Sequence, residues 1–115
     1  MGREGMKYFA EGLQFITKIK YIELNIKGNE IDGTGFEYLS QAFYKLTDLA
    51  CLQLDFSNNQ IGTNGAKLIA NEIKNMHFLR QFDIDLVGNE IEYQGYISIV
   101  QELKKLTSLN SYSYR

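Results

Sequence analysis

The residues that could do chemistry in this chain are few. Asp83 and Asp85 flank Ile84 in an alternating segment, so their carboxylates would share one face of a strand and could bind a metal ion or act as general acid and base. An acid–base pair needs two different environments, and no histidine or nucleophile accompanies these two on that face. The sequence therefore predicts no catalytic residue, no metal site and no cofactor.

The single histidine and the single cysteine add no further chemistry. His77 falls at the C-terminal end of a predicted helix, where a positive charge is favourable, so we interpret it as a surface or capping residue. Cys51 has no basic neighbour on its predicted strand face that would favour the thiolate. As the only cysteine it cannot form an internal disulfide, and such a thiol suits a reducing compartment, so we expect a cytoplasmic protein.

The size and charge of the chain limit the class of protein. Its 115 residues are enough for one domain, and no proline-rich or glycine- and serine-rich stretch divides them. The formal net charge of -2 gives no reason to expect nucleic acid or an anionic membrane as a partner. The chain also lacks a run of 18 apolar residues that could span a membrane. We therefore expect one domain whose partner is a protein.

The dominant feature of the sequence is a repeat of 30 residues without slippage. Three columns keep this spacing: the leucine column (Ile19, Leu49, Leu79 and Leu109), the asparagine column (Asn29, Asn59 and Asn89) and the glycine column (Gly35, Gly65 and Gly95). A fixed period of this length is typical of stacked-repeat proteins. It divides the chain into a partial copy at 1–18, complete copies at 19–48, 49–78 and 79–108, and a partial copy at 109–115.

Each copy is predicted to form a strand, a turn and a helix. In the copy at 49–78 the apolar residues first alternate, a turn follows at Asn58-Asn59, and helical spacing begins after Gly65. The predicted core positions of this copy are Leu52, Leu54, Phe56, Ala66, Ile69, Ala70, Ile73 and Met76. Those of the partial copy at 1–18 are Met6, Phe9, Ala10, Leu13 and Ile16.

These copies resemble the leucine-rich repeat, in the ribonuclease-inhibitor-like class with an α-helix in each repeat. The resemblance rests on the segments 49–73, 19–39 and 79–95 and covers nearly the whole chain. The chain departs from the family pattern by one additional inward–outward pair before the asparagine, Phe56-Ser57 in the copy at 49–78, from which we expect a longer strand. The resemblance implies an α/β fold, a right-handed solenoid forming a horseshoe segment, with parallel strands on the concave face and helices on the convex face.

Two of the columns are interpreted as structural. The resemblance implies that the asparagine column forms a ladder, in which the amides satisfy backbone groups left unpaired where each strand becomes a turn. The glycine column would provide an unusual φ or a close backbone approach at the entry to each helix. A phosphate-binding loop is the alternative for these glycines, but the strings that contain them lack the Lys-Ser/Thr pair of such loops.

Residues between the inward apolar positions of the strands point into the hollow of such a solenoid and form the candidate binding face. This face consists of Tyr21, Glu23, Asn25, Lys27, Gln53, Asp55, Ser57, Gln81, Asp83 and Asp85. Its carboxylates are opposed mainly by Lys27 and Arg115, so we expect a negative patch that attracts a partner with a basic surface. The alternative is that these charges only keep a water-exposed face soluble.

Both ends of the array keep apolar residues where a terminal repeat would need a polar outer face. The partial copy at 1–18 retains the core residues named above, and the last predicted strand carries Leu109, Tyr112 and Tyr114. We expect further repeats or another subunit to cover these ends.

The predicted function is non-catalytic. We expect a protein–protein interaction module, either a fragment of a longer leucine-rich-repeat scaffold or a small subunit of a larger assembly. One alternative is a regulator of a small GTPase, because the Ran GTPase-activating protein resembles the same helix-containing class. The other alternative is an inhibitor of a basic enzyme, which the acidic face and the name of the class suggest.

Overall fold

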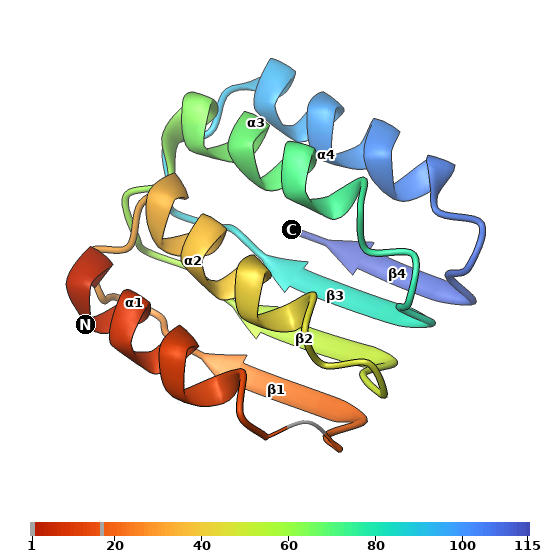
Figure 1. Ribbon diagram of the computed structural model, residues 1–115. Helices are drawn as coiled ribbons and strands as arrows, with labels where there is room; N and C mark the ends of the chain where they lie inside the picture. The colour runs from red at the N-terminus through yellow and green to blue at the C-terminus, as the bar shows by residue number, and fades with distance from the viewer. Residues whose placement is uncertain (1, 17) are drawn as a thin grey trace.

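Helices and strands alternate along the chain. The computed structural model describes residues 2–16 and 18–115. The elements are α1 (Gly2–Leu13), β1 (Tyr21–Asn25), α2 (Gly33–Phe43), β2 (Cys51–Asp55), α3 (Gly62–Ile73), β3 (Gln81–Asp85), α4 (Tyr93–Lys105) and β4 (Ser111–Tyr114). The strands form one parallel four-stranded sheet in the order β1-β2-β3-β4 (Figure 1). The predicted α/β architecture with parallel strands is confirmed.

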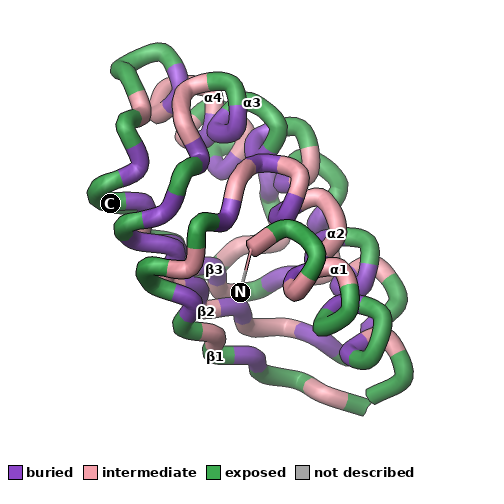
Figure 2. Tube along the Cα trace, turned by 90° about the vertical axis from the view of Figure 1, so that its left-hand side faces the viewer, coloured by how far each residue is buried: buried purple, intermediate pink, exposed green. Residues whose placement is uncertain are grey.

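The register of the sheet follows the 30-residue period. Tyr21 pairs with Cys51, Cys51 with Gln81, and Gln81 with Ser111. Residues 30 positions apart therefore lie side by side on neighbouring strands, and each column of the sequence becomes a row across the sheet. All four helices lie on one side of the sheet and leave its other face open, as the two views in Figures 1 and 2 show.

The core lies between the sheet and the layer of helices. All predicted core positions of the copy at 49–78 are buried, and none is more than 4% exposed. Phe56 packs edge-to-face against Phe36 of the preceding copy, with ring centroids 5.6 Å apart. Burying a side chain of this size contributes about 1.5–3 kcal/mol. Because such contacts join neighbouring copies, each copy depends on the next for its stability.

The partial copy at 1–18 is less buried than predicted. Met6, Ala10 and Leu13 belong to the core, but Phe9 is 36% exposed and Ile16 is 55% exposed. Helix α1 ends at Leu13, so Ile16 no longer follows the buried stripe of the helix. In addition, among the helices described in 2–16 and 18–115, α1 has a neighbour only on its α2 side (Figure 1). The prediction that Phe9 and Ile16 are core residues is wrong.

The additional pair of residues in each copy does not lengthen the strands. Strand β2 ends at Asp55, before Phe56 and Ser57, so this prediction is wrong. Hydrogen bonding between neighbouring copies nevertheless continues past the strand. The backbone N–H of Phe56 donates to the carbonyl of Asp85 at 2.9 Å, and that of Asn58 donates to the carbonyl of Val87 at 2.8 Å. The additional pair therefore extends the hydrogen bonding between copies beyond the end of the strand, although the pair itself is not part of the strand.

The glycine column provides close approach rather than an unusual backbone angle. These glycines have no positive φ and lie within the first turn of their helices. A Cβ at Gly35, Gly65 or Gly95 would lie 2.8, 2.9 or 2.7 Å from the Cγ2 of the isoleucine four residues earlier. Each glycine thus lets the turn pack directly onto the start of the helix. Positive φ occurs instead just after the additional pair, at Gly28, Asn58 and Gly88. It also occurs at Glu30 and Glu90 in the bends, and at Gly2 and Gly62, where α1 and α3 begin.

The asparagine column lies at the bend that follows each strand. Asn89 Nδ2 donates to the carbonyl of Leu86 in its own copy and to that of Phe56 in the preceding copy, both at 2.9 Å. Its Oδ1 accepts from the backbone N–H of Ile61 at 3.1 Å. One amide therefore satisfies backbone groups of two copies, where the change from strand to turn would otherwise leave them unpaired.

Candidate protein-interaction face

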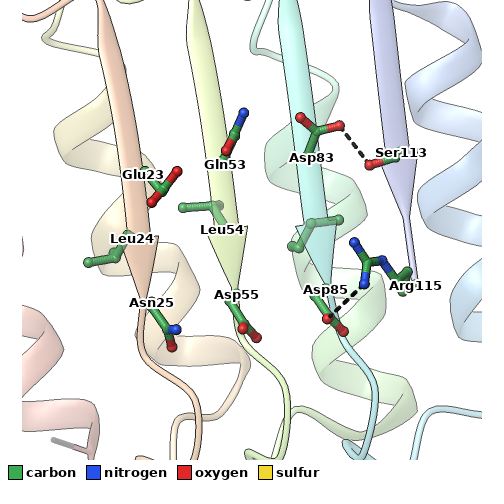
Figure 3. A pocket seen from close by; sticks show the side chains of 11 residues that line it. Glu23, Leu24, Asn25, Gln53, Leu54, Asp55, Asp83, Asp85, Ser113 and Arg115 are labelled. Atoms are coloured by element: carbon green, nitrogen blue, oxygen red, sulfur yellow. Dashed lines mark hydrogen bonds and ion pairs between the residues drawn. The ribbon is translucent and has the colours of Figure 1, made fainter.

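The face of the sheet that no helix covers contains a shallow hollow of about 300 Å³. We name this surface the open sheet face. It is lined by Glu23, Leu24, Asn25, Gln53, Leu54, Asp55, Asp83, Ile84, Asp85, Ser113 and Arg115 (Figure 3). Because the sheet is in register, its polar side chains form two rows across the strands. The first row runs from Glu23 to Ser113. The second contains Asn25, Asp55 and Asp85, and continues to Arg115, whose backbone bonds to Ile84 and Leu86 just beyond the end of β4.

The first row is held by hydrogen bonds between side chains. Asp83 accepts from the hydroxyl of Ser113 at 2.6 Å and from Nε2 of Gln81 at 2.9 Å. Glu23 Oε2 accepts from the Tyr21 hydroxyl at 3.0 Å. Residues at the beginning of a strand thus orient carboxylates two positions later on the same face, as the alternation of strand side chains requires.

The second row stands at the ends of the strands and is oriented by the backbone. In Asn25, Asp55 and Asp85, Oδ1 accepts from the backbone N–H two residues later, at 3.1, 3.0 and 3.0 Å. Such turns are favoured by Asn and Asp because their short side chains reach the backbone two residues on. The same local bond in three copies places three side chains in one line across the open sheet face.

Asp55 receives a further hydrogen bond. The hydroxyl of Ser57 donates to Asp55 Oδ1 at 2.6 Å. This bond, followed by that from the Ser57 backbone N–H, holds the pKa of Asp55 below its usual value. A carboxyl group with a lower pKa in the folded protein stabilises the fold above its unfolded pKa, about 3.9. That contribution is lost as the pH falls through the folded pKa.

Replacing Ser57 by alanine is expected to raise the pKa of Asp55 towards its usual value, because the stronger of its two local donors is removed. The measurement is a pH titration of the Asp55 carboxyl carbon by NMR, in the wild type and in Ser57→Ala. Asp32 is the internal control, since its pKa is lowered mainly by the hydrogen bond from Arg3. An Asp55 titration that does not move would show that the hydroxyl does not stabilise the carboxylate.

Negative charge predominates in the hollow. Among the residues that line it, Glu23, Asp55, Asp83 and Asp85 are acidic, and Arg115 is the one cation. The guanidinium Nη1 of Arg115 lies 3.9 Å from Asp85 Oδ2, and its side chain is largely exposed. An exposed pair at that separation is weak, so it neutralises little of the field of the four carboxylates.

The segment at 49–70 matches a family model described as the leucine-rich repeat. The alternating helices and parallel strands fit a repeat of this type. The matched residues contain β2, the bend at Asn59 and most of α3, and the same elements recur in register before and after them. A search of the curated proteins found no match.

The fold brings six of the predicted face residues to the hollow: Glu23, Asn25, Gln53, Asp55, Asp83 and Asp85. Tyr21 and Gln81 lie beside it and support the first row. Lys27 is exposed beyond the end of β1, where its charge acts on Asp55. The prediction that Ser57 belongs to the binding face is corrected. Its side chain is buried, at 7% exposure, and it orients Asp55 instead of facing a partner.

The remaining reactive groups, Cys51 and His77, belong to neither row. Cys51 is half-buried, and burial raises the pKa of its thiol, which disfavours the thiolate. His77 is exposed in the turn after α3. Within 2–16 and 18–115, no three His, Cys, Asp or Glu side chains are placed to hold a metal ion. None of the helices described there is long and apolar enough to cross a membrane.

Proposed function

We propose that this leucine-rich-repeat array is a non-catalytic protein-interaction module whose open sheet face binds basic side chains of a protein partner. The observation that carries the proposal is the hollow with four carboxylates and one arginine. Leucine-rich repeats are in general an interaction fold, and they present the sheet face as an extended surface. The proposal thus assigns to this surface the kind of partner that its charge favours.

The two rows offer carboxylate oxygens to a partner. Asp55 uses Oδ1 for its turn and for Ser57, while Oδ2 has no hydrogen-bond donor among the residues that the structure describes. In Figure 3, Asp55 and Asp85 stand on neighbouring strands, at paired positions of the sheet. Neighbouring strands lie about 4.8 Å apart, so one guanidinium or ammonium group could approach both carboxylates. Association with such a partner would be accelerated by the field of the face and slowed by salt.

The class of the repeat, the bounds of the array and the location of the protein are also part of this proposal. We place the array in the ribonuclease-inhibitor-like class, because the complete copies carry α-helices of 11, 12 and 13 residues. We treat 1–115 as one array, with partial copies at 1–18 and 109–115, because one sheet runs through all four strands. A cytoplasmic location is consistent with the lone, half-buried thiol of Cys51.

Removing three charges from the open sheet face is expected to abolish most partner binding. The variant is Asp55→Asn, Asp83→Asn, Asp85→Asn, which keeps side-chain size and the turn-forming oxygens. Immobilised wild type and variant are compared by affinity capture from native lysate, with bound proteins identified and quantified by mass spectrometry at low and at high salt. Captured partners should be lost with the variant and released from the wild type by salt.

The matched control removes the same number of charges elsewhere, by Glu4→Gln, Asp48→Asn and Glu90→Gln at exposed positions outside the hollow. It should retain the partners, because net charge alone does not create a site. Equal recovery by the wild type and both variants would place binding on the helices or at the ends of the array, and would refute the role of the open sheet face.

A further inference from the structure

Neighbouring helices of the array meet through equivalent positions. The groove between α1 and α2 is lined by Lys7 and Ala10 of α1 with Gln14 in the turn after it, and by Tyr38 and Ala42 of α2 with Lys45 in the turn after it, among others. We name the first set of positions the forward flank of a helix and the second set the backward flank. Lys45 Nζ of the backward flank donates to Gln14 Oε1 of the forward flank at 2.7 Å. Equivalent positions line the groove between α3 and α4.

The forward flank of α4, at one end of the array (Figure 1), has none of the described helices against it. It consists of Ile97, Val100 and Lys104, and the first two are only partly buried. At the position of Ile97 the other helices carry charged residues: Lys7, Glu37 and Lys67. Packing between the helices of this array therefore does not require an apolar residue at this position. The apolar residue occurs only in α4, whose forward flank packs against none of the described helices.

The backward flank of α1, at the opposite end, shows the same inversion at one of its positions. It consists of Tyr8, Gly12 and Phe15, of which Tyr8 is 65% exposed and Phe15 is 80% exposed. At the position of Phe15 the other copies carry polar residues: Lys45, Asn75 and Lys105. Large exposed aromatic residues gathered on one flank indicate a surface that binds something.

The sheet offers complementary edges beside these two flanks. Strand β4 is one edge and β1 is the other. Tyr112 and Tyr114 occupy inward positions of β4 but remain 37% and 42% exposed. If the register of the sheet continued by one more strand, Tyr112 would pair with a residue equivalent to Ile22 and Tyr114 with one equivalent to Leu24. Edge strands left open in this way readily pair with another chain.

Charges at the two ends also complement each other. In the groove between α3 and α4, Lys74 lies with Gln101. Lys104 is equivalent to Lys74, and Glu11 is equivalent to Gln101. If the α1 end of a second molecule packed on α4 in the same way, Lys104 would lie beside Glu11 of that molecule. On the sheet, Arg115 would lie diagonally across from Glu23 of the added strand, within reach of a long side chain. Both contacts join opposite charges.

We propose that the partner of each end is a second copy of this chain, docked head to tail. The α1–β1 end of one copy lies on the α4–β4 end of another, in the register that joins neighbouring copies within the chain. The contact uses two different surfaces, so it is heterologous, and each dimer leaves one end of each kind free. Association should therefore continue to larger species as concentration rises.

The test uses one variant blocked at each end. Tyr8→Lys with Phe15→Lys blocks the α1 end, and Ile97→Lys with Val100→Lys blocks the α4 end. Lysine occurs in other copies at two of the four positions: Lys45 is equivalent to Phe15, and Lys7 and Lys67 are equivalent to Ile97. Masses are measured by sedimentation velocity and light scattering between about 1 μM and about 1 mM, after circular dichroism has verified that each variant is folded.

The wild type should show a mass that increases with concentration, and each blocked variant alone should remain a monomer. An equimolar mixture of the two variants should form a complex of twice the monomer mass and no larger, since one free α4 end then meets one free α1 end. A chain with all four substitutions should bind neither of the two blocked variants. A monomeric wild type, a mixture without the complex, or self-association of either blocked variant would overturn the proposal.

Discussion

Replacing Asn59 by alanine is expected to lower the free energy of unfolding by about 3 kcal/mol, because each buried polar group left without a partner costs about 1–3 kcal/mol. The Asn59 side chain serves two copies. Its Oδ1 accepts from the backbone N–H groups of Asn29 and Ile31 in the preceding copy, at 2.8 and 2.9 Å. Its Nδ2 donates to the carbonyl of Ile26 in that copy at 3.1 Å and to that of Phe56 in its own at 2.8 Å.

Water can replace little of this network. Asn59 is buried, and the Ile31 N–H that it accepts from belongs to a fully buried residue. Alanine therefore removes donor and acceptor together and leaves backbone groups of both copies unsatisfied. Because the loss falls at the junction between copies, it should also weaken the packing of β1 and α2 on β2 and α3.

Urea unfolding followed by far-ultraviolet circular dichroism measures the effect. The control is Asn71→Ala, at an exposed position on α3, where alanine is the better helix former and stability should stay the same or rise slightly. An Asn59→Ala protein whose unfolding midpoint equals that of the wild type would show that the asparagine column does not hold the copies together.

The repeat allowed much of the fold to be predicted from the sequence. A fixed period forces residues 30 apart into one environment, so the columns gave the strand register and the buried face of the helices without knowledge of any contact. The acidic members of the open sheet face were predicted for the same reason. Once the inward positions were known, Asp55, Asp83 and Asp85 had to face the other way.

The predictions fail at residues whose surroundings differ from those of the equivalent residues in the other copies. Phe9 and Ile16 match the core columns, but α1 lacks a helix on one side and ends before Ile16, so both remain exposed. Ser57 stands in an outward column, yet a local turn folds it onto Asp55. The sequence does not indicate that Gly33 must be glycine, because the equivalent positions are Thr63 and Tyr93. Only the structure shows that Gly33 lies close to Gly65 and Leu68.

Replacing Gly33 by alanine is expected to destabilise the protein by about 2 kcal/mol. A Cβ at this position would lie 2.7 Å from the Cα of Gly65 and 3.0 Å from Cδ1 of Leu68. The first neighbour is backbone and cannot rotate away, so the beginnings of α2 and α3 must separate. Forcing extra atoms into a packed contact costs about 1–3 kcal/mol, which exceeds the helix-propensity gain of about 0.5–1 kcal/mol from glycine to alanine.

Gly12→Ala is the matched control, because a Cβ at Gly12 in α1 would meet nothing within 4 Å. There only the propensity gain remains, so urea unfolding should show this variant to be more stable than the wild type by about 0.5–1 kcal/mol. The same substitution should thus change stability in opposite directions in two helices of one array. If Gly33→Ala also stabilised the protein, the close approach of α2 and α3 at Gly33 and Gly65 would not limit how these two copies pack.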